Sequence, residues 1–334
     1  MRERLAHKLP LSVPYSITVT TSNVCNLKCE YCAISENRKN RNKSFIDWQT
    51  FQLVVDRLIE SNWHLKQIIF VGLGEPLLNK DIVKFVRYAK AANIADKVHI
   101  VSNGTLLTEV LGDALIDAGL DVMRFSINGL SADDYLKYTG RTIDFPAMIQ
   151  RMQYFYDAKP ASLKIYSKIM DYMVETEEKK IKFEEIFGRI SDVINIEYMT
   201  QMSTTLDYST IAPLNAKKGL KGFRTKDVEV CPLPFYHIYV NAEGTVSACC
   251  VAGPWYVPPA LEMGDLHEKT FDEIYRSPEG DFHKFLLRML FDGREKASEI
   301  CRRCKAYTSY IYPEDVIDDE RYRIAEDMKC EQYK

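Results

Sequence analysis

The chain has 334 residues, of which 46% are hydrophobic and 27% are charged, and its formal net charge is −3. This length suffices for one large domain and a smaller one, and the interspersed charges indicate neither a nucleic-acid-binding nor a membrane-binding surface. Residues 1–16 lack the apolar run of a secretory signal, and no stretch reaches the roughly 18 apolar residues of a spanning helix. We therefore expect a cytoplasmic protein whose nine cysteines serve metal or redox chemistry rather than disulfides.

Strand-favouring apolar runs alternate with amphipathic segments between about residues 14 and 200. The predicted strands are 16–21, 67–72, 98–102, 122–127, 163–170 and 193–199. The predicted helices between them are 45–61, 82–93, 109–119, 145–158 and 179–190. This alternation predicts a parallel α/β sheet. The local pattern leaves open whether the sheet is open or closed into a barrel.

The pattern changes near residues 215–225. Strands at 235–240 and 245–250, joined by a glycine-containing turn, predict a β-hairpin, and a helical stretch follows at 271–293. We therefore divide the chain into a large domain, a small domain and a C-terminal tail, with the boundaries 1–220, 221–310 and 311–334. The tail is expected either to pack against the large domain or to be disordered.

Three cysteines lie within eight residues directly after the first predicted strand: Cys25, Cys29 and Cys32. The C-terminal ends of parallel strands are where α/β barrels carry their chemistry. A closed zinc site usually has four ligands, whereas three thiolates in C-x3-C-x2-C spacing suit a cubane iron–sulfur cluster with one open iron. We therefore favour an iron–sulfur cluster over zinc and over a chance group of thiols.

A second group of cysteines lies in the C-terminal part of the chain, at Cys231, Cys249, Cys250, Cys301 and Cys304. Four of these thiols could complete a tetrathiolate site that holds either zinc or a second iron–sulfur cluster. The spacing alone does not choose the metal. Cys330, close to the end, is expected to be a surface thiol without a function.

The C-x3-C-x2-C segment, with Tyr31 before its last cysteine, resembles the signature of radical SAM enzymes. In that family the open iron chelates S-adenosylmethionine (SAM), and reductive cleavage gives a 5′-deoxyadenosyl radical that removes a hydrogen atom from the substrate. The resemblance implies a partial (β/α)6 TIM-like barrel and a [4Fe–4S] cluster on the three cysteines. It also implies an electron donor such as flavodoxin or ferredoxin.

The segment VGLGEP at 71–76 resembles the glycine–glutamate segment of the same family. The resemblance implies that Gly74 lets the backbone approach the methionine end of SAM and that Glu75 accepts a hydrogen bond from its ammonium group. Many members have Gly-Gly-Glu where this chain has Gly-Leu-Gly-Glu. A glycine turn after a strand is common, so this segment alone is weak evidence.

Polar residues that end the next strands are similar to further SAM-binding positions. Ser102 and Asn103 would lie near the adenosine, and Ser126 would face the ribose or the methionine. Arg141 would pair with the carboxylate of SAM. Capping of strand ends is an equal alternative for the serines, for Asn103 and for Asn128, and a solvated surface position is the alternative for Arg141.

The later cysteines resemble the SPASM or twitch extension of radical SAM enzymes. A glycine followed by four residues and a cysteine, as in 244–249, favours Cys249 over Cys250 as a ligand. The cysteines suffice for one auxiliary [4Fe–4S] cluster, with the implied ligands Cys231, Cys249, Cys301 and Cys304. Cys250 is then either a small buried hydrophobe or a thiol that donates a hydrogen atom to a substrate radical.

The resemblance implies a small polar substrate, such as a sugar, an aminocyclitol or a nucleotide-linked sugar, and an epimerisation or a dehydrogenation. Tyr166, Lys168 and Glu197 are candidates for substrate contact if alternation turns them into the barrel. A SPASM-type peptide maturase is a second hypothesis. Such enzymes often carry an N-terminal peptide-recognition domain, whereas only some fifteen residues precede the first predicted strand here. A non-catalytic metal-binding protein is a third.

Overall fold

The computed structural model describes residues 2–32, 44–200, 206–211, 218–223, 227–249, 261–305, 307 and 311–330. Within these residues, the strands form one sheet in the order β6-β5-β4-β3-β2-β1-β7-β8-β9. They are β1 (Ser16–Thr20), β2 (Gln67–Val71), β3 (Val98–Ser102), β4 (Val122–Ile127), β5 (Lys164–Met170), β6 (Val193–Glu197), β7 (His237–Val240), β8 (Thr245–Ser247) and β9 (Glu262–Asp265). Strands β1 to β6 pair in parallel, and β6 and β9 are the two ends of the sheet. The predicted parallel sheet, curved into a partial barrel that does not close, is confirmed.

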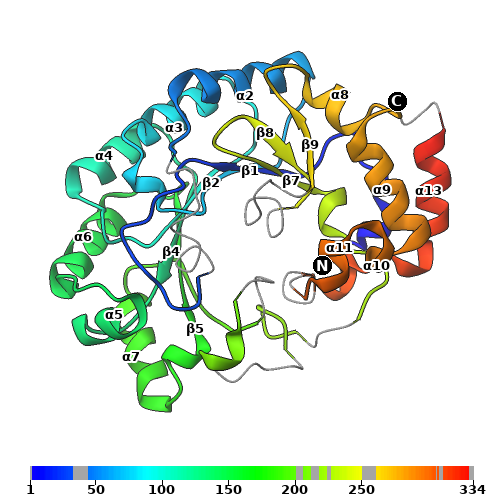
Figure 1. Cartoon of the computed structure of the whole chain (residues 1–334). Helices are drawn as coiled ribbons and strands as arrows, with labels where there is room; N and C mark the ends of the chain where they lie inside the picture. The colour runs from blue at the N-terminus through cyan, green and yellow to red at the C-terminus, as the bar shows by residue number, and fades with distance from the viewer. Residues whose placement is uncertain are drawn as a thin grey trace.

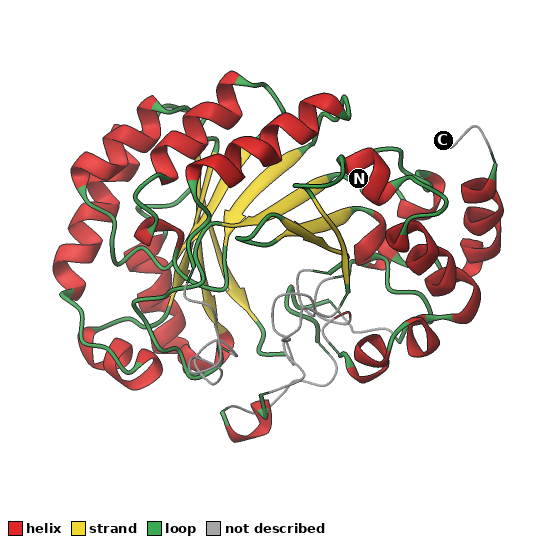
Figure 2. Cartoon of the chain, turned by 45° about the horizontal axis from the view of Figure 1, so that its top comes forward, coloured by secondary structure: helices red, strands yellow, loops and turns green. Residues whose placement is uncertain are grey.

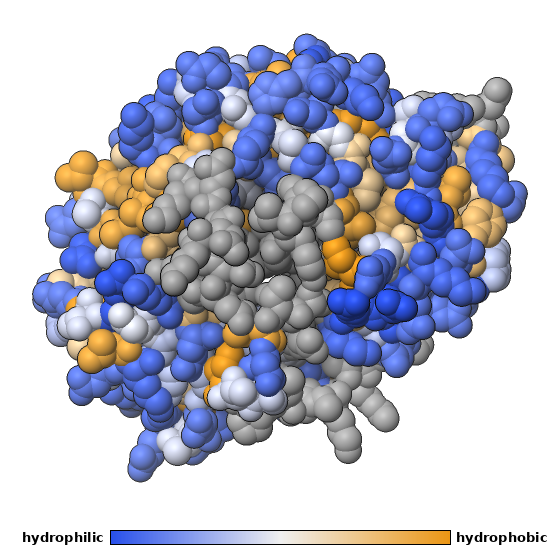
Figure 3. All heavy atoms as spheres, in the orientation of Figure 1, coloured by the Kyte–Doolittle hydropathy of each residue, from blue (hydrophilic) through white to orange (hydrophobic). Residues whose placement is uncertain are grey.

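Helices cover the outer face of the curved sheet (Figures 1 and 2). Those of the N-terminal part are α2 (Trp48–Glu60), α3 (Ile82–Ala91), α4 (Glu109–Asp117), α5 (Ala132–Thr139), α6 (Phe145–Ala158) and α7 (Glu177–Phe187). The C-terminal helices are α8 (Phe271–Tyr275), α9 (Asp281–Asp292), α10 (Arg294–Ala297), α11 (Glu299–Arg303) and α13 (Arg321–Lys329). Hydrophilic residues predominate on the helices along the rim of the view in Figure 3. In the described residues, no helix combines the length and the apolar character needed to cross a membrane.

Aromatic packing between helix α2 and the sheet illustrates why the outer face is buried. Asp47 caps α2 by accepting a hydrogen bond from the backbone of Thr50 at 2.7 Å, which satisfies one of the unpaired N–H groups of the first turn. Phe51 projects from α2 against Phe70 of β2, with ring centroids 5.4 Å apart. Edge-to-face aromatic pairs of this kind add to the free energy gained from burial.

The opposite face of the strands lines the interior of the partial barrel. Side chains alternate along a strand, so the neighbours of a residue that contacts an outer helix point into the barrel. Phe125 of β4 contacts Phe155 of α6 on the outside, so Arg124 and Ser126 point inward. The register pairs Arg124 with Tyr166 and Ser126 with Lys168 of β5. The alternation therefore turns Tyr166 and Lys168 into the barrel.

The predicted hairpin is confirmed as β7 and β8, which pair antiparallel around a turn at 241–244. Gly244 takes a φ of +88° in this turn, a left-handed conformation that favours glycine. The sequence did not reveal that β7 pairs in parallel with β1, or that β9 extends the hairpin. The domain boundary near residue 220 stays a prediction, because the C-terminal strands continue the same sheet.

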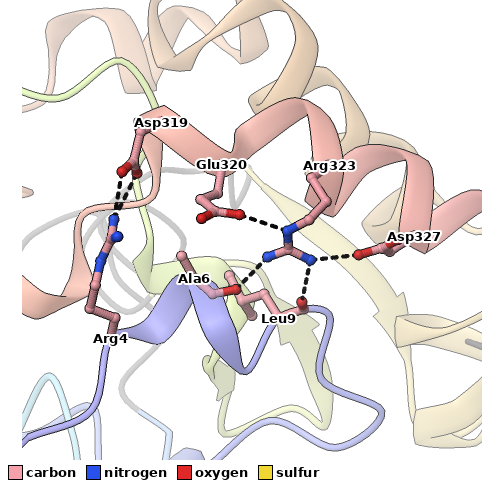
Figure 4. Close-up of polar contacts among 7 residues, drawn as sticks. All are labelled: Arg4, Ala6, Leu9, Asp319, Glu320, Arg323 and Asp327. Carbon is pink, nitrogen blue, oxygen red and sulfur yellow. Dashed lines mark hydrogen bonds and ion pairs between the residues drawn. The ribbon is translucent and has the colours of Figure 1, made fainter.

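The described part of the C-terminal tail packs against helix α9 and the N-terminal segment; packing against the large domain or disorder was expected. Figure 4 shows Arg323 of α13 donating to the carbonyl oxygens of Ala6 (2.6 Å) and Leu9 (3.5 Å). Asp319 accepts hydrogen bonds from Arg4 in the same view. Ile324 on the other side of α13 is fully buried. The two ends of the described chain are therefore joined by charge-assisted hydrogen bonds and a small apolar contact.

Two helical predictions needed correction. The stretch 271–293 forms two helices, α8 and α9, because Pro278 and Gly280 interrupt it; proline cannot donate the helical hydrogen bond. Helix α5 was not predicted as an element. The apolar pattern of α2 placed Ile59 on the buried face of the helix, but its side chain is 54% exposed.

We predict that Phe51→Ala destabilises the fold while Ile59→Ala does not. Phe51 is fully buried between α2, α3 and β2, and such a truncation costs about 3–5 kcal/mol. Truncation of the exposed Ile59 should change the free energy of unfolding by no more than about 0.5 kcal/mol. Urea denaturation monitored by circular dichroism measures both, and equal effects would contradict the packing described above.

Candidate functional site

The loop after β1 carries the first three cysteines at the C-terminal end of that strand. Its backbone is fixed to the end of α5, because the N–H of Lys28 donates to the carbonyl of Thr139 at 2.9 Å. Inside the loop, the N–H of Leu27 donates to Cys25 Sγ at 3.4 Å. The three thiols are partly buried: Cys25, Cys29 and Cys32. The loop therefore presents them at the edge of the sheet where the sequence placed them.

The glycine segment after β2 lies directly against the backbone of the cysteine loop. The N–H of Gly74 donates to Ser22 O and that of Glu75 donates to Val24 O, both at 2.8 Å. A Cβ atom on Gly74 would lie 2.0 Å from Val24 O, and one on Gly72 would lie 2.3 Å from Ser22 O. Both positions therefore require glycine, since any side chain would push the cysteine loop away from β2.

Glu75 is buried and joins three elements through hydrogen bonds. Its Oε1 accepts from Ser102 Oγ (2.7 Å) and from the N–H of Leu77 (3.0 Å), and its Oε2 accepts from the N–H of Asn103 (2.8 Å). Burial raises the pKa of this carboxyl, and the three donors oppose that shift. A carboxylate has about four acceptor sites, so the ammonium contact of Glu75 stays a prediction. The bond from Ser102 agrees with the capping role that was given as its alternative.

Two asparagines connect neighbouring strand ends to the cysteines. Asn103 lies with its Nδ2 4.0 Å from Cys25 Sγ, and Asn128, after β4, lies with its Oδ1 3.7 Å from Cys29 Sγ. The same Oδ1 accepts a hydrogen bond from Tyr31 Oη at 2.8 Å. Burial raises the pKa of the Tyr31 phenol well above its usual value, and the neighbouring thiols add to the effect. Tyr31 is thus a neutral hydrogen-bond donor beside the cysteine loop.

Charged side chains lie inside the barrel, close to Tyr31. Glu197 at the end of β6 is 1% exposed, and its Oε2 lies 2.7 Å from Lys168 Nζ. Its other oxygen is bonded to Lys221. Burial alone would raise the pKa of Glu197, but the two ammonium groups lower it to about 2. Glu197 is therefore ionised at neutral pH.

Four of the C-terminal cysteines line one mostly apolar cavity. Its lining includes Cys231, Cys249, Cys301 and Cys304 together with Leu233, Phe285, Met289 and Ile300. Burial raises the pKa of the Cys231 and Cys301 thiols, that of Cys301 to about 12, and the neighbouring thiols contribute to both shifts. These four thiols are brought together by the end of β8, the start of β7 and helix α11, although they are far apart in the sequence.

Arg294 and Tyr307 complete this cavity and were missed by the sequence interpretation. Arg294 is 6% exposed. Its Nε donates to Val228 O at 3.1 Å and its Nη1 donates to Cys301 O at 3.4 Å. The guanidinium carbon lies 4.2 Å from the ring centre of Tyr307. An arginine between two glycine-bounded helices carries no sequence signal for this position, which arises from tertiary packing.

The donor sets fit clusters better than single metal ions. In the parts of the chain that the structure describes, no three Cys, His, Asp or Glu side chains converge closely enough to hold one ion. A cubane cluster binds each thiolate through a different iron, so its cysteines are spread more widely than those of a zinc site. Three thiols on one loop and four around a mostly apolar cavity are the donor sets that a cubane cluster with one open iron and a fully ligated cluster would use.

Comparison with protein families gives the same division of the chain. Residues 19–180 match the model of the radical SAM superfamily, and residues 231–305 match the model of an iron–sulfur cluster-binding (SPASM) domain. The chain therefore carries a radical SAM domain followed by a C-terminal SPASM domain. The predicted cofactors, which are SAM, its [4Fe–4S] cluster and auxiliary iron–sulfur binding, are confirmed by these matches. The cysteines that ligate each cluster remain predictions.

Curated relatives of this radical SAM protein include GTP 3′,8-cyclases. The chain is 34% identical to that of Chlorobaculum tepidum over 125 residues, which are 37% of this chain and 36% of the relative. It is 27% identical to the probable GTP 3′,8-cyclase of Methanocaldococcus jannaschii over 179 residues, which are 54% of this chain and 58% of the relative. The matches thus span between about a third and somewhat more than half of these relatives.

Solved structures with the same fold cover more of the chain. BtrN in complex with AdoMet and 2-DOIA gives a TM-score of 0.56 at 19% identity and covers 88% of this chain and 93% of that one. The native anSMEcpe with bound AdoMet gives a TM-score of 0.58 at 16% identity and covers 96% and 98%. SuiB from Streptococcus suis bound to S-adenosylmethionine gives 0.60 at 15% identity, with 91% and 77% covered. At these identities the similarity establishes the fold.

The remaining predicted site residues lie in different surroundings. Ser126 faces the barrel interior, and its carbonyl accepts a hydrogen bond from Asn128 Nδ2 at 2.9 Å. Arg141 follows the left-handed Gly140 after α5 and is exposed, which is the alternative given for it above. Cys250 lies outside the described residues. The SAM-binding roles stay predictions for all seven residues: Tyr31, Gly74, Glu75, Ser102, Asn103, Ser126 and Arg141.

We predict that Gly74→Ala selectively impairs the first cluster. The added Cβ would clash with Val24 O, so the cysteine loop must move and its thiols lose their arrangement. Iron per chain after anaerobic reconstitution should fall by about half, from about eight to about four, while the far-ultraviolet circular dichroism stays unchanged. Full iron loading and full visible cluster absorption in the variant would show that the contact does not hold the loop.

We also predict that Arg294 raises the reduction potential of the auxiliary cluster. A buried cation next to a cluster stabilises its more negative, reduced form. Arg294→Met should lower the midpoint potential by roughly tens of millivolts, whereas Arg294→Lys should retain most of it. Redox titration monitored by electron paramagnetic resonance, with Cys25, Cys29 and Cys32 replaced by alanine, isolates the auxiliary signal. Equal potentials in the two Arg294 variants would refute the electrostatic role.

Proposed function

We propose that this protein is a radical SAM enzyme that removes a hydrogen atom from a small polar substrate containing a nucleotide. The proposal is carried by the charged residues on the inner face of the barrel: Glu197 ends β6 at the same edge of the sheet as the cysteine loop after β1, and it pairs with Lys168 and Lys221. When bound, the cluster and SAM supply a 5′-deoxyadenosyl radical. The barrel interior is the part of the chain next to that radical.

A nucleotide is favoured by the curated relatives, which are named as GTP 3′,8-cyclases. A free nucleotide was not among the three substrate types inferred from the sequence; the nucleotide-linked sugar shares with it the phosphates, the ribose and the base. Phosphates, hydroxyl groups and a base all require polar partners, and the inner barrel face offers Arg124, Tyr166 and Lys168. The relatives support an intramolecular cyclisation as the outcome, in place of the epimerisation or dehydrogenation inferred from the sequence.

Each group of residues has a proposed task. The cysteine loop binds the first cluster, and Gly72 and Gly74 hold that loop against β2. Glu75 fixes the ends of β2 and β3 so that Asn103 stays beside Cys25. The charged residues of β4, β5 and β6 bind and orient the substrate below the loop. The apolar cavity around the C-terminal cysteines excludes water from the auxiliary cluster, which protects it and tunes its potential.

The two other hypotheses have weaker support. A peptide substrate rests on the fold shared with SuiB, a likeness at 17% identity that concerns architecture alone. The non-catalytic metal-binding hypothesis does not explain why a buried polar network converges on the cysteine loop. Epimerisation with Cys250 as hydrogen donor stays open as a variant of the proposed reaction.

The proposal predicts that reconstituted protein cleaves SAM to 5′-deoxyadenosine under anaerobic reduction with dithionite. GTP, and separately a set of nucleotide-linked sugars, should raise the rate of cleavage several-fold, because a bound substrate consumes the radical. Deuterium transferred from substrate to 5′-deoxyadenosine, measured by mass spectrometry, identifies the hydrogen that is removed. The control is the Cys25/Cys29/Cys32→Ala triple variant, which should form no 5′-deoxyadenosine.

Two results would contradict different parts of this function. Absence of 5′-deoxyadenosine from fully iron-loaded wild-type protein would refute radical SAM chemistry itself. If a peptide accelerates SAM cleavage and no nucleotide does, the substrate is a peptide, and the radical SAM chemistry of the proposal still holds. The product of an accelerated reaction then distinguishes cyclisation, oxidation and inversion.

A further inference from the structure

Three cationic side chains lie together on one wall of the barrel interior. Arg124 comes from β4 and Lys168 from β5. Lys168 pairs with Ser126, two residues after Arg124, so both side chains lie on the same face of the sheet. Lys221 arrives from the segment 218–223 and bonds to Glu197, which also binds Lys168. None of these contacts was expected from the sequence, since Arg124 and Lys221 belong to no motif. We call Arg124, Lys168 and Lys221 the basic wall.

The basic wall carries more positive charge than its own carboxylate neutralises. Glu197 is the acid that contacts it within the described residues, and this acid is ionised, because the ammonium groups hold its pKa at about 2 despite burial. Three cations therefore share one anion. Burial lowers the pKa of Lys168, and the positive charges of Arg124 and Lys221 act in the same direction. Partly buried like charges repel each other, so an additional anion would stabilise the wall.

Two groups on the same inner face lack partners among the described residues. Arg124 makes no hydrogen bond or ion pair there, although its guanidinium offers five donors. His99 of β3 is 4% exposed, and its buried Nε2 has no hydrogen-bond partner in the structure. Burial and then the charges of Arg124 and Lys168 lower the pKa of His99 to about 3. A buried polar atom without a partner is costly, and here it lies beside cations that have spare donors.

We propose that the basic wall, with His99, binds a phosphate group of the substrate. The planar guanidinium of Arg124 matches two phosphate oxygens, and Lys168 and Lys221 add two ammonium donors whose positions Glu197 fixes. The three cations of the basic wall and the one carboxylate of Glu197 leave a net charge of about +2, which matches the charge of a phosphate group. The neutral imidazole of His99 supplies one further hydrogen bond to the ligand. This inference rests on the proposed function, since it assigns the anionic part of the same substrate.

The carboxylate of SAM is the competing anion, and the register argues against it. SAM would be held by the cluster at the C-terminal ends of the strands, where the cysteine loop and Asn128 lie. Arg124 lies four residues before Asn128 on β4, about 13 Å lower at about 3.3 Å per residue. Its charge acts on His99, which lies still lower, because the register pairs His99 with Val122. The basic wall thus begins at Lys168 and Lys221, near the C-terminal strand ends, and extends down the barrel to Arg124.

The test compares anion binding in matched charge variants of the full-length reconstituted protein. Isothermal titration calorimetry under anaerobic conditions measures the affinities for pyrophosphate, GTP, guanosine and SAM. The variants are Arg124→Met and Lys168→Met, with Arg124→Lys as the charge-conserving rescue. Lys182→Met is the control, because Lys182 lies exposed on the outer helix α7. Each protein is first checked for wild-type iron content and melting temperature.

We expect Arg124→Met and Lys168→Met to weaken pyrophosphate and GTP binding at least tenfold and to leave SAM binding unchanged. Arg124→Lys should restore part of the affinity, and Lys182→Met should behave as wild type. Guanosine should bind equally in all variants. Pyrophosphate binding that is unaffected in both Met variants would overturn the proposal, and so would a parallel loss of SAM binding. The proposed function fails separately, if wild-type protein forms no 5′-deoxyadenosine.

Discussion

The close contact between the glycine segment and the cysteine loop is the constraint on which the rest of the site depends. The backbone of Gly74 comes so near to Val24 that no side chain fits between them, and Glu75 continues this contact into the end of β3. A loop with three thiols and few apolar residues has little reason to adopt one conformation by itself. Here two strands and a helix end hold it, and these contacts fix the position of the cysteines.

One sheet positions both groups of cysteines. The first group follows the end of β1, whereas Cys231 precedes the start of β7 and Cys249 follows the end of β8. Because β7 runs parallel to β1 and antiparallel to β8, the two groups leave the sheet from opposite ends of the paired strands. Their surroundings differ accordingly: the loop meets polar strand ends, and the second group lies in an apolar cavity with one buried arginine. An open, SAM-binding site and a closed, auxiliary site require this difference.

The sequence predicted the parts of the molecule that depend on local patterns. The first six strands agree with the structure to within two residues at each end, because buried parallel strands are short apolar runs between polar segments. The cysteine groups were found because their spacing is a local property. Contacts between distant segments were not predictable in this way. Lys221 binds Glu197, Arg294 joins the auxiliary cavity, and β7 pairs with β1 through tertiary packing that no neighbouring residues encode. Glu75 was recognised as important, yet two of its three internal hydrogen bonds come from Ser102 at the end of β3 and from Asn103 directly after it.

The most direct measurement of this account is iron and acid-labile sulfide per chain in three proteins after anaerobic reconstitution. They are the wild type, the Cys25/Cys29/Cys32→Ala variant and the Cys231/Cys249/Cys301/Cys304→Ala variant. Two separate cubane clusters predict about eight irons and eight sulfides in the wild type and about four of each in either variant. If the wild type binds only about four irons, and the Cys231/Cys249/Cys301/Cys304→Ala variant retains all of them, the C-terminal cysteines hold no iron–sulfur cluster. That result would contradict the account of two clusters.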